Sequence, residues 1–185
     1  MAERPEHLDR VDRAEWWVTG IILLVSLLII WTAVRPPMYD ASSHLATGVI
    51  AERILAGDEF TRAHYYFLAE PVTYWLTTLG LVATKSFGTY TSFNLLLSLY
   101  AIAMPLSFFL LARDFAPPAL RYTPLIALTV FNWAYWRGET NFLFGQPLLP
   151  LATWLFLRSR RVFSPSFAGF ILAAMLVYLA HIFVL

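Results

Sequence analysis

The chain has 185 residues, of which 59% are hydrophobic and 14% charged, and its mean hydropathy is +0.62. Soluble domains carry about 25% charged residues, so this composition excludes an ordinary soluble domain and predicts an integral membrane protein. The formal net charge of +1 comes without a basic patch and gives no reason to expect nucleic acid as a partner, while the lack of cysteine excludes disulfides and thiolate chemistry.

Residues 16–34 are the first apolar stretch. These nineteen uncharged residues are enough for a helix to cross a hydrocarbon core of about 30 Å. We therefore predict a first transmembrane helix here, preceded by a cytoplasmic tail at residues 1–15. The mixed charges of the tail do not suit a secretory signal, so we expect the span to be retained. Arg35, Pro36 and Pro37 then end the helix, because proline disfavours helical backbone in the residue before it.

Residues 35–90 are predicted to form an extracytoplasmic loop that contains juxtamembrane helices. Its first part, residues 35–71, holds seven of the chain's sixteen acidic and histidine residues, in a stretch longer than a connection between two spans needs. A helix is predicted to begin at Asp40, whose carboxylate is a candidate N-cap, and apolar residues then recur at helical spacing opposite polar ones. Such a helix lies on the membrane surface.

Residues 71–86 decide the topology. This stretch is apolar, but its sixteen residues reach only about 24 Å as a helix. If it spans, five basic residues lie on the cytoplasmic side and eight outside. If it only dips into the interface, eight lie inside and five outside. The positive-inside rule therefore favours a helix that dips without crossing.

Four further spans are predicted, at residues 91–112, 123–136, 142–157 and 163–185, which makes about five transmembrane helices in one polytopic membrane domain over residues 1–185. Gly145, Gln146, Pro147 and Pro150 predict a broken helix within residues 142–157, because proline frees backbone carbonyls that neighbouring protein or water must satisfy. The last helix runs to Leu185 without a cap or tail, so we expect the chain to be a portion of a longer one.

With the N-terminus in the cytoplasm, this topology puts the polar residues of both outward loops on the extracytoplasmic side, where they could converge on one cavity. Two histidines have simpler expected roles: His64 packs among its aromatic neighbours, and His181 is a buried, hydrogen-bonded residue of the last helix. The extracytoplasmic set is Asp40, His44, His64, Glu70, Arg137, Glu139, Asn141 and Gln146.

Several of these residues keep two interpretations. Asp40 and His44 stand at i and i+4, so the carboxylate can orient the imidazole or share a ligand with it; alternatively, Asp40 only caps the helix and His44 is interfacial. Glu70 either complements the dipole of the following helix or faces the cavity. Arg137 and Glu139 either serve a site at the membrane edge or pair with each other.

The order of these features resembles the GT-C superfamily of lipid-sugar-dependent glycosyltransferases. The segment PPMYDASSH, residues 36–44, is similar to the first extracytoplasmic loop of that superfamily, and Asp40 is the position that matches its catalytic aspartate. The segment EPVTYW, residues 70–75, resembles the acidic-Pro-Pro-x-x-Tyr-Trp stretch of arabinose and mannose transferases. NFLFGQPLLPL, residues 141–151, resembles the GQ-initiated helix of polyprenol-phosphate mannosyltransferases.

The resemblance implies an enzyme, or its amino-terminal membrane module, that transfers a sugar from a polyprenyl-phosphate donor to an extracytoplasmic acceptor in a bacterial inner membrane. Asp40 would be the catalytic base, and the residues expected to bind substrate are His44, Glu70, Arg137, Glu139, Asn141 and Gln146. No cofactor is expected with certainty, and a divalent metal stays open. Membrane lipid is an expected partner. The alternative is a non-catalytic accessory subunit packed against other membrane subunits of a larger complex.

Overall fold

The computed structural model describes residues 6–33, 38–66, 75–159 and 161–180, with side chains from residue 13 onward. Within these ranges every regular element is a helix, which confirms the predicted all-α class. The α-helices and 3-10 helices are α1 (Glu6–Thr32), α2 (Ala41–Ala56), α3 (Glu59–His64), α4 (Trp75–Ala83), η1 (Lys85–Phe87), α5 (Thr89–Phe115), η2 (Pro117–Tyr122), α6 (Thr123–Leu128), η3 (Thr129–Phe131), α7 (Trp133–Arg137), α8 (Thr140–Arg158) and α9 (Pro165–Ala180).

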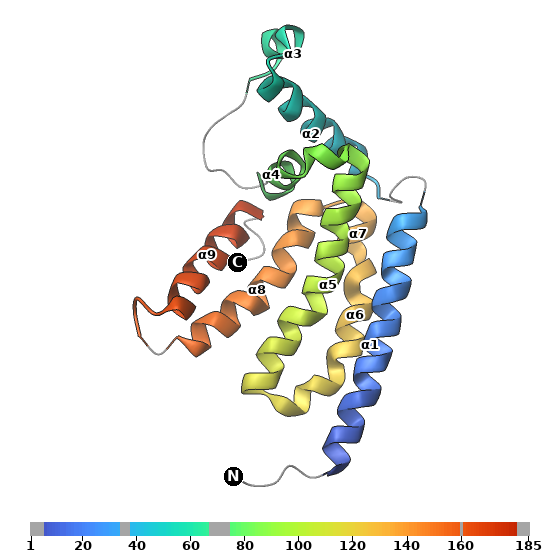
Figure 1. The fold of residues 1–185 in the computed structure, drawn as a ribbon, viewed down its shortest axis with the longest axis vertical. Coiled ribbons are helices and arrows are strands. Elements are labelled where there is room, and N and C mark those ends of the chain that lie inside the picture. The colour runs from blue at the N-terminus through green and yellow to red at the C-terminus, as the bar shows by residue number, and fades with distance from the viewer. Residues whose placement is uncertain (1–5, 34–37, 67–74, 160, 181–185) are drawn as a thin grey trace.

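The long helices form an antiparallel bundle with α5 at its centre. Figure 1 shows α1, α6–α7 and α9 running in one direction, and α5 and α8 running in the other. α5 packs against α1, α6 and α8, and α9 packs on α8. The end of the bundle where α1 ends and α5 begins carries α2, α3 and α4, and we call it the α2 end. The opposite end, where α5 passes through η2 into α6, is the α6 end.

Two helices of the described chain, within Arg13–Thr32 and Thr89–Phe115, are long and apolar enough to cross a membrane. They coincide with the spans predicted at residues 16–34 and 91–112. α1 begins earlier than expected: it starts at Glu6 and so includes most of the predicted tail. α4, over Trp75–Ala83, has a length of about 14 Å, which is less than a hydrocarbon core of about 30 Å, and the prediction that residues 71–86 do not span stays a prediction. Residues 71–74 lie outside the described residues.

Two predicted details of the bundle are wrong. The single helix expected over residues 123–136 is divided into α6, η3 and α7, because Asn132 has extended backbone and its side chain accepts a hydrogen bond from the backbone N–H of Tyr135, 3.1 Å away. This bond caps a new helix instead of continuing the old one. The break expected near residue 146 is absent, since α8 is continuous over Thr140–Arg158 with Pro147 and Pro150 inside it.

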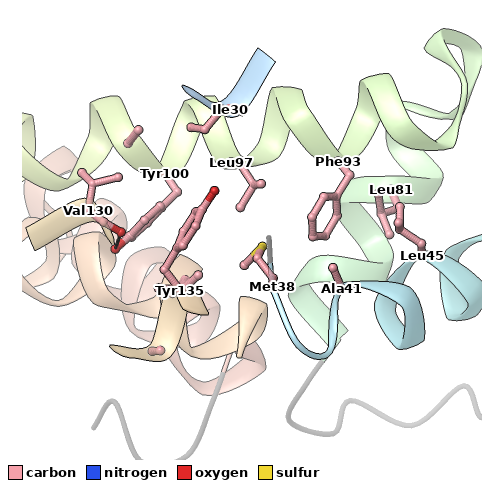
Figure 2. Close-up of a cluster of buried hydrophobic side chains, with 13 residues drawn as sticks. Ile30, Met38, Ala41, Leu45, Leu81, Phe93, Leu97, Tyr100, Val130 and Tyr135 are labelled. Atoms are coloured by element: carbon pink, nitrogen blue, oxygen red, sulfur yellow. Dashed lines mark hydrogen bonds between the residues drawn. The ribbon is translucent and has the colours of Figure 1, made fainter. Parts of the chain in front are cut away.

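A buried apolar cluster joins the bundle to the helices at the α2 end. Figure 2 shows Phe93, Leu97 and Tyr100 projecting from one face of α5 toward Met38, which precedes α2, and Tyr135 of α7. All three α5 residues are almost fully buried. Burial of such side chains typically stabilises a fold by about 1.5–3 kcal/mol each, so this cluster fixes the start of α2 against the bundle.

Candidate functional site

The segment before α2 is bound to the turn between α7 and α8. The backbone N–H of Tyr39 donates to the carbonyl of Trp136 at 3.0 Å, and that of Asp40 donates to the carbonyl of Arg137 at 3.1 Å. Gly138 makes this approach possible. Its φ is +79°, and a Cβ at this position would lie 2.7 Å from the backbone nitrogen of Asp40. The turn therefore brings residue 40 against residues 137–138, which are far away in sequence.

Asp40 and His44 are at the first turn of α2, as predicted. Asp40 occupies the N-cap position and is exposed, but its side chain makes no capping hydrogen bond. His44 is half-buried beside the Gly138 backbone. Burial lowers the pKa of His44 below 6.5, while its hydrogen bond to the Gly138 backbone and the charge of Asp40 act in the opposite direction. The site thus pairs an exposed carboxylate with an imidazole that favours the neutral form at pH 7.

Arg137 and Glu139 stand on either side of Gly138 and form the ion pair that was one of their two predicted roles. Nε of Arg137 lies 3.3 Å from Oε1 of Glu139. The guanidinium carbon of Arg137 is 4.7 Å from the ring centre of Trp133, which gives a cation–π contact. Both side chains of the pair remain accessible at the surface. The structure therefore brings Asp40, His44, Arg137 and Glu139 to one turn at the α2 end.

A groove of about 550 Å³ runs along α2, and its lining begins with Met38 and Ala41, which are near Asp40 in the sequence. Its size falls within the range of roughly 300–1,000 Å³ that small-molecule sites have. The walls are mainly apolar, with a serine, a threonine and a tyrosine hydroxyl, and sequence reasoning did not identify them. They are Met38, Ala41, Ser42, Leu45, Ala46, Val49, Thr89 and Tyr90. The sequence feature that could have indicated this groove is the recurrence of small and apolar residues at helical spacing along one side of α2.

Asn141 has a role in the fold that was not predicted. It is buried, and its Oδ1 accepts hydrogen bonds from both the backbone N–H and the hydroxyl of Thr77, each at 2.9 Å. The same hydroxyl contacts Oγ1 of Thr140 at 3.0 Å. Thr77 belongs to the first turn of α4, whose N–H groups have no partner within the helix. Asn141 therefore fastens α4 to α8. Its expected contact with substrate stays a prediction.

Gln146 also lies in an internal network. Its Oε1 accepts hydrogen bonds from the hydroxyl of Tyr100 at 3.2 Å and from Nδ2 of Asn132 at 3.0 Å. The hydroxyl of Tyr100 also lies 3.2 Å from the carbonyl of Val130. These groups surround the break between α6 and α7. Polar groups freed by a broken helix need such partners, so Gln146 stabilises the break. Its expected role in substrate binding stays a prediction.

The remaining predicted residues divide into two groups. Glu70 and His181 lie outside the described residues. His64 is exposed, stacks on Phe60 with ring centres 4.4 Å apart, and has Nδ1 2.8 Å from the Phe60 carbonyl, in agreement with the predicted aromatic packing. Across the part of the chain that the structure describes, no three histidine or carboxylate side chains form a group that could hold a metal ion. The divalent metal stays an open expectation.

A polar cluster at the α6 end was not predicted. Asp114, next to the last residue of α5, accepts from Arg113 Nε at 2.8 Å on one oxygen. The other oxygen accepts from Trp154 Nε1 at 2.9 Å and from an Arg158 terminal nitrogen at 3.0 Å. These bonds join the end of α5 to the end of α8. The residues of α5 and α8 that they join are about forty positions apart, so no local pattern indicates them.

Comparisons of this chain with protein-family models, with curated proteins and with solved structures give no significant match. The geometry of the site therefore carries the functional argument.

Replacing Asn141 with leucine is expected to lower stability, because the replacement leaves the buried backbone N–H of Thr77 without its acceptor, while the Thr77 hydroxyl keeps only its contact with Thr140. A buried unsatisfied group costs about 1–3 kcal/mol, so the thermal midpoint in detergent should fall by about 4–8 °C at roughly 2–4 °C per kcal/mol. The control is Asn94→Leu on α5, where the half-buried amide makes no side-chain hydrogen bond within the described structure. Equal midpoints for the two variants would contradict the fastening role of Asn141.

Proposed function

We propose that this chain is a GT-C-like membrane glycosyltransferase, or its amino-terminal module, that transfers a sugar from a polyprenyl-phosphate donor to an extracytoplasmic acceptor. The observation that supports this proposal best is the position of Asp40. Its carboxylate is exposed and makes no capping hydrogen bond, the half-buried His44 follows one helical turn later, and Met38 and Ala41, near Asp40 in the sequence, line the α2 groove. Because this carboxylate is not engaged in a capping hydrogen bond, it is available to accept a proton from an acceptor hydroxyl.

In the proposed reaction, Asp40 removes the proton from an acceptor hydroxyl. The hydroxyl oxygen forms a bond to the anomeric carbon of the donor sugar, and the bond from that carbon to the polyprenyl phosphate breaks, so that the phosphate leaves with the electron pair. Such a displacement inverts the anomeric centre. Arg137 is placed to bind the departing phosphate, because its Nε side is paired with Glu139 while the guanidinium remains accessible. In this proposal His44, one helical turn after Asp40 and within reach of its charge, would help to orient the acceptor.

The proposal includes a polytopic arrangement of about five spans in a bacterial inner membrane, with the N-terminus in the cytoplasm. It is supported by the two long apolar helices and by the alternating directions of α1, α5, α6–α7, α8 and α9 in Figure 1. Exposed arginines at the α6 end, Arg113, Arg121, Arg158 and Arg161, are of the kind that marks a cytoplasmic face. The α2 end, which carries Asp40, then faces outward.

Single cysteines test this topology directly, because the natural chain has none. Lys85→Cys should react with a membrane-impermeant maleimide added from outside intact cells, and Arg121→Cys should react only after the membrane is opened. Both positions are exposed, so access to solvent is comparable. Reaction of the Lys85→Cys variant from the cytoplasmic side alone would mean that residues 71–86 cross the membrane and that positions 40 and 85 face opposite sides.

The activity itself is tested by incubating the purified protein with a radiolabelled polyprenyl-phosphate sugar and cell-envelope acceptor. Transfer of label to the acceptor, with release of polyprenyl phosphate, is the expected result. If no label moves while the protein remains folded, the catalytic proposal fails for this chain.

A second candidate function is supported by α1. Only 17% of its most apolar stretch is buried against the rest of the described structure. Trp17, Ile21, Leu24 and Leu28 are among the large side chains it exposes. Lipid covers such a face in a single polytopic protein, and another subunit covers it in a complex. Stable co-purification of this chain with a larger membrane assembly, together with no transfer activity, would favour the accessory-subunit function.

A further inference from the structure

A small cleft opens at the α6 end, away from Asp40. It has a volume of about 160 Å³ and lies between α1, α5 and the η2–α6 connection. Trp16 and Phe109 form part of its wall and meet edge to face, with ring centres 4.4 Å apart. This volume is below the roughly 300–1,000 Å³ of a site that encloses a drug-sized molecule. The cleft therefore suits a compact polar group attached to something larger that lies outside it.

Arg113 supplies the charged hydrogen-bond donors of this cleft, whose lining also contains the indole of Trp16. The two threonine hydroxyls of the lining already donate to backbone carbonyls: Thr19 to Glu15 and Thr123 to Leu120, each at 2.7 Å. A guanidinium has five N–H donors, and Asp114 is bonded through Nε of Arg113. The guanidinium carbon lies 5.7 Å from the centre of the Phe109 ring, which also lines the cleft. Its planar fork suits two oxygens of a phosphate.

The surroundings favour a negatively charged group that belongs to a lipid. Arg113 and Glu15 are the charged residues of the lining, and three further charged residues, Arg13, Asp114 and Arg121, lie within two positions of it among the residues with described side chains, so three cations face two carboxylates. Arg113 lies in the last turn of α5, where the headgroups of a bilayer would be if α5 crosses it. The exposed apolar face of α1 continues from Trp16 toward the middle of the bundle. Hydrocarbon attached to a group in the cleft would therefore lie along α1.

We propose that this cleft binds the phosphate of an anionic glycerophospholipid through Arg113, with the acyl chains on the exposed face of α1. The inference rests on the membrane location within the proposed function, but it does not require sugar transfer. A failed lipid-binding experiment leaves the role of Asp40 unchanged, and a failed transfer assay leaves the lipid site unchanged. The two proposals can therefore be overturned separately.

The test is native mass spectrometry of the purified chain in a neutral detergent, titrated with phosphatidylglycerol. Arg113→Gln should weaken binding about 10-fold or more, because a hydrogen bond to a charged group is worth about 1.5–3 kcal/mol. Arg161→Gln is the matched control, since it removes the same charge from an exposed position at the same end. Equal weakening by the two substitutions would indicate diffuse charge attraction and would overturn the site.

Two further variants separate binding from folding. Leu120→Trp keeps Arg113 but fills the cleft, so it should weaken lipid binding about as much as Arg113→Gln does. Asp114→Asn removes the charge that pairs with Arg113 and Arg158 but keeps an oxygen that accepts hydrogen bonds between α5 and α8, and it leaves the cleft cation, so it should retain binding within about twofold. Loss of binding in Asp114→Asn as large as in Arg113→Gln would overturn the proposal. Inorganic phosphate should not displace the lipid at equal concentration, and effective displacement would reduce the cleft to a site for free anions.

Discussion

Asp40→Asn is expected to reduce sugar transfer by about 10² to 10⁴-fold while the thermal midpoint stays unchanged. This range is typical for the loss of a general base. Stability should not change, because the Asp40 side chain makes no capping hydrogen bond in α2 and asparagine serves an N-cap position about as well as aspartate. The measurement is the initial rate of label transfer from a polyprenyl-phosphate sugar, with the midpoint recorded on the same preparation.

The structure also makes Asp40→Ala informative, since there is no capping bond for alanine to remove. Glu59→Gln provides the control, because it neutralises another exposed carboxylate at the α2 end. It should retain the parental rate. If Asp40→Asn transfers sugar at the parental rate, Asp40 is not the base, and Glu139 becomes the next carboxylate to replace.

Gly138→Ala is expected to lower stability by about 3 kcal/mol, which corresponds to roughly 6–12 °C in the thermal midpoint. About 1 kcal/mol comes from placing a Cβ on left-handed backbone. The rest comes from the backbone hydrogen bonds of Tyr39 and Asp40, which are lost when the Cβ displaces the Asp40 nitrogen that would lie 2.7 Å away. Because the displaced segment carries Asp40, transfer activity should fall as well.

Gly57→Ala is the matched control for this prediction. Gly57 ends α2 with φ +87° and ψ 17°, close to the φ +79° and ψ 24° of Gly138. A Cβ at Gly57 would meet only the Arg62 side chain, at 3.8 Å or more. Gly57→Ala should therefore lower stability only by the cost of backbone strain, about 1 kcal/mol. Similar losses in the two variants would mean that the contact between Gly138 and Asp40 contributes little.

The long helices could be predicted because they are determined by local composition. Residues 91–112 are mainly apolar and contain no charged residue, which predicts a helix, and α5 exceeds this range by only two or three residues at either end. Asp40 and His44 were placed on one helix from their spacing, which depends on α-helical geometry alone. The division at Asn132 was missed, although asparagine is a strong N-cap residue, because the apolar run over residues 123–136 concealed it.

Other features depend on partners that are distant in sequence. The sequence around Asn141 predicts a substrate ligand, which stays a prediction, and gives no sign of its bond to Thr77, which is 64 residues away. Gln146 and Tyr100 are also hydrogen-bonded across a long stretch of sequence, as are Asp114 and Arg158. Pro147 and Pro150 indicated a break in α8 on local grounds. The helix continues through them, and Pro147 is buried within the bundle, so packing outweighs the local preference.

The bonds from Tyr39 and Asp40 to Trp136 and Arg137 also determine when the site can form during synthesis. Tyr39 and Asp40 emerge from the ribosome roughly 100 residues before Trp136 and Arg137. At a translation rate of about 5–20 residues per second, the segment carrying Asp40 waits about 5–20 seconds for the turn that holds it. α5 and α6 must be made and packed into the bundle in that interval. The carboxylate therefore acquires its surroundings only after three passages of the bundle have been completed, so a chain that stops before residue 138 leaves the site without its anchor.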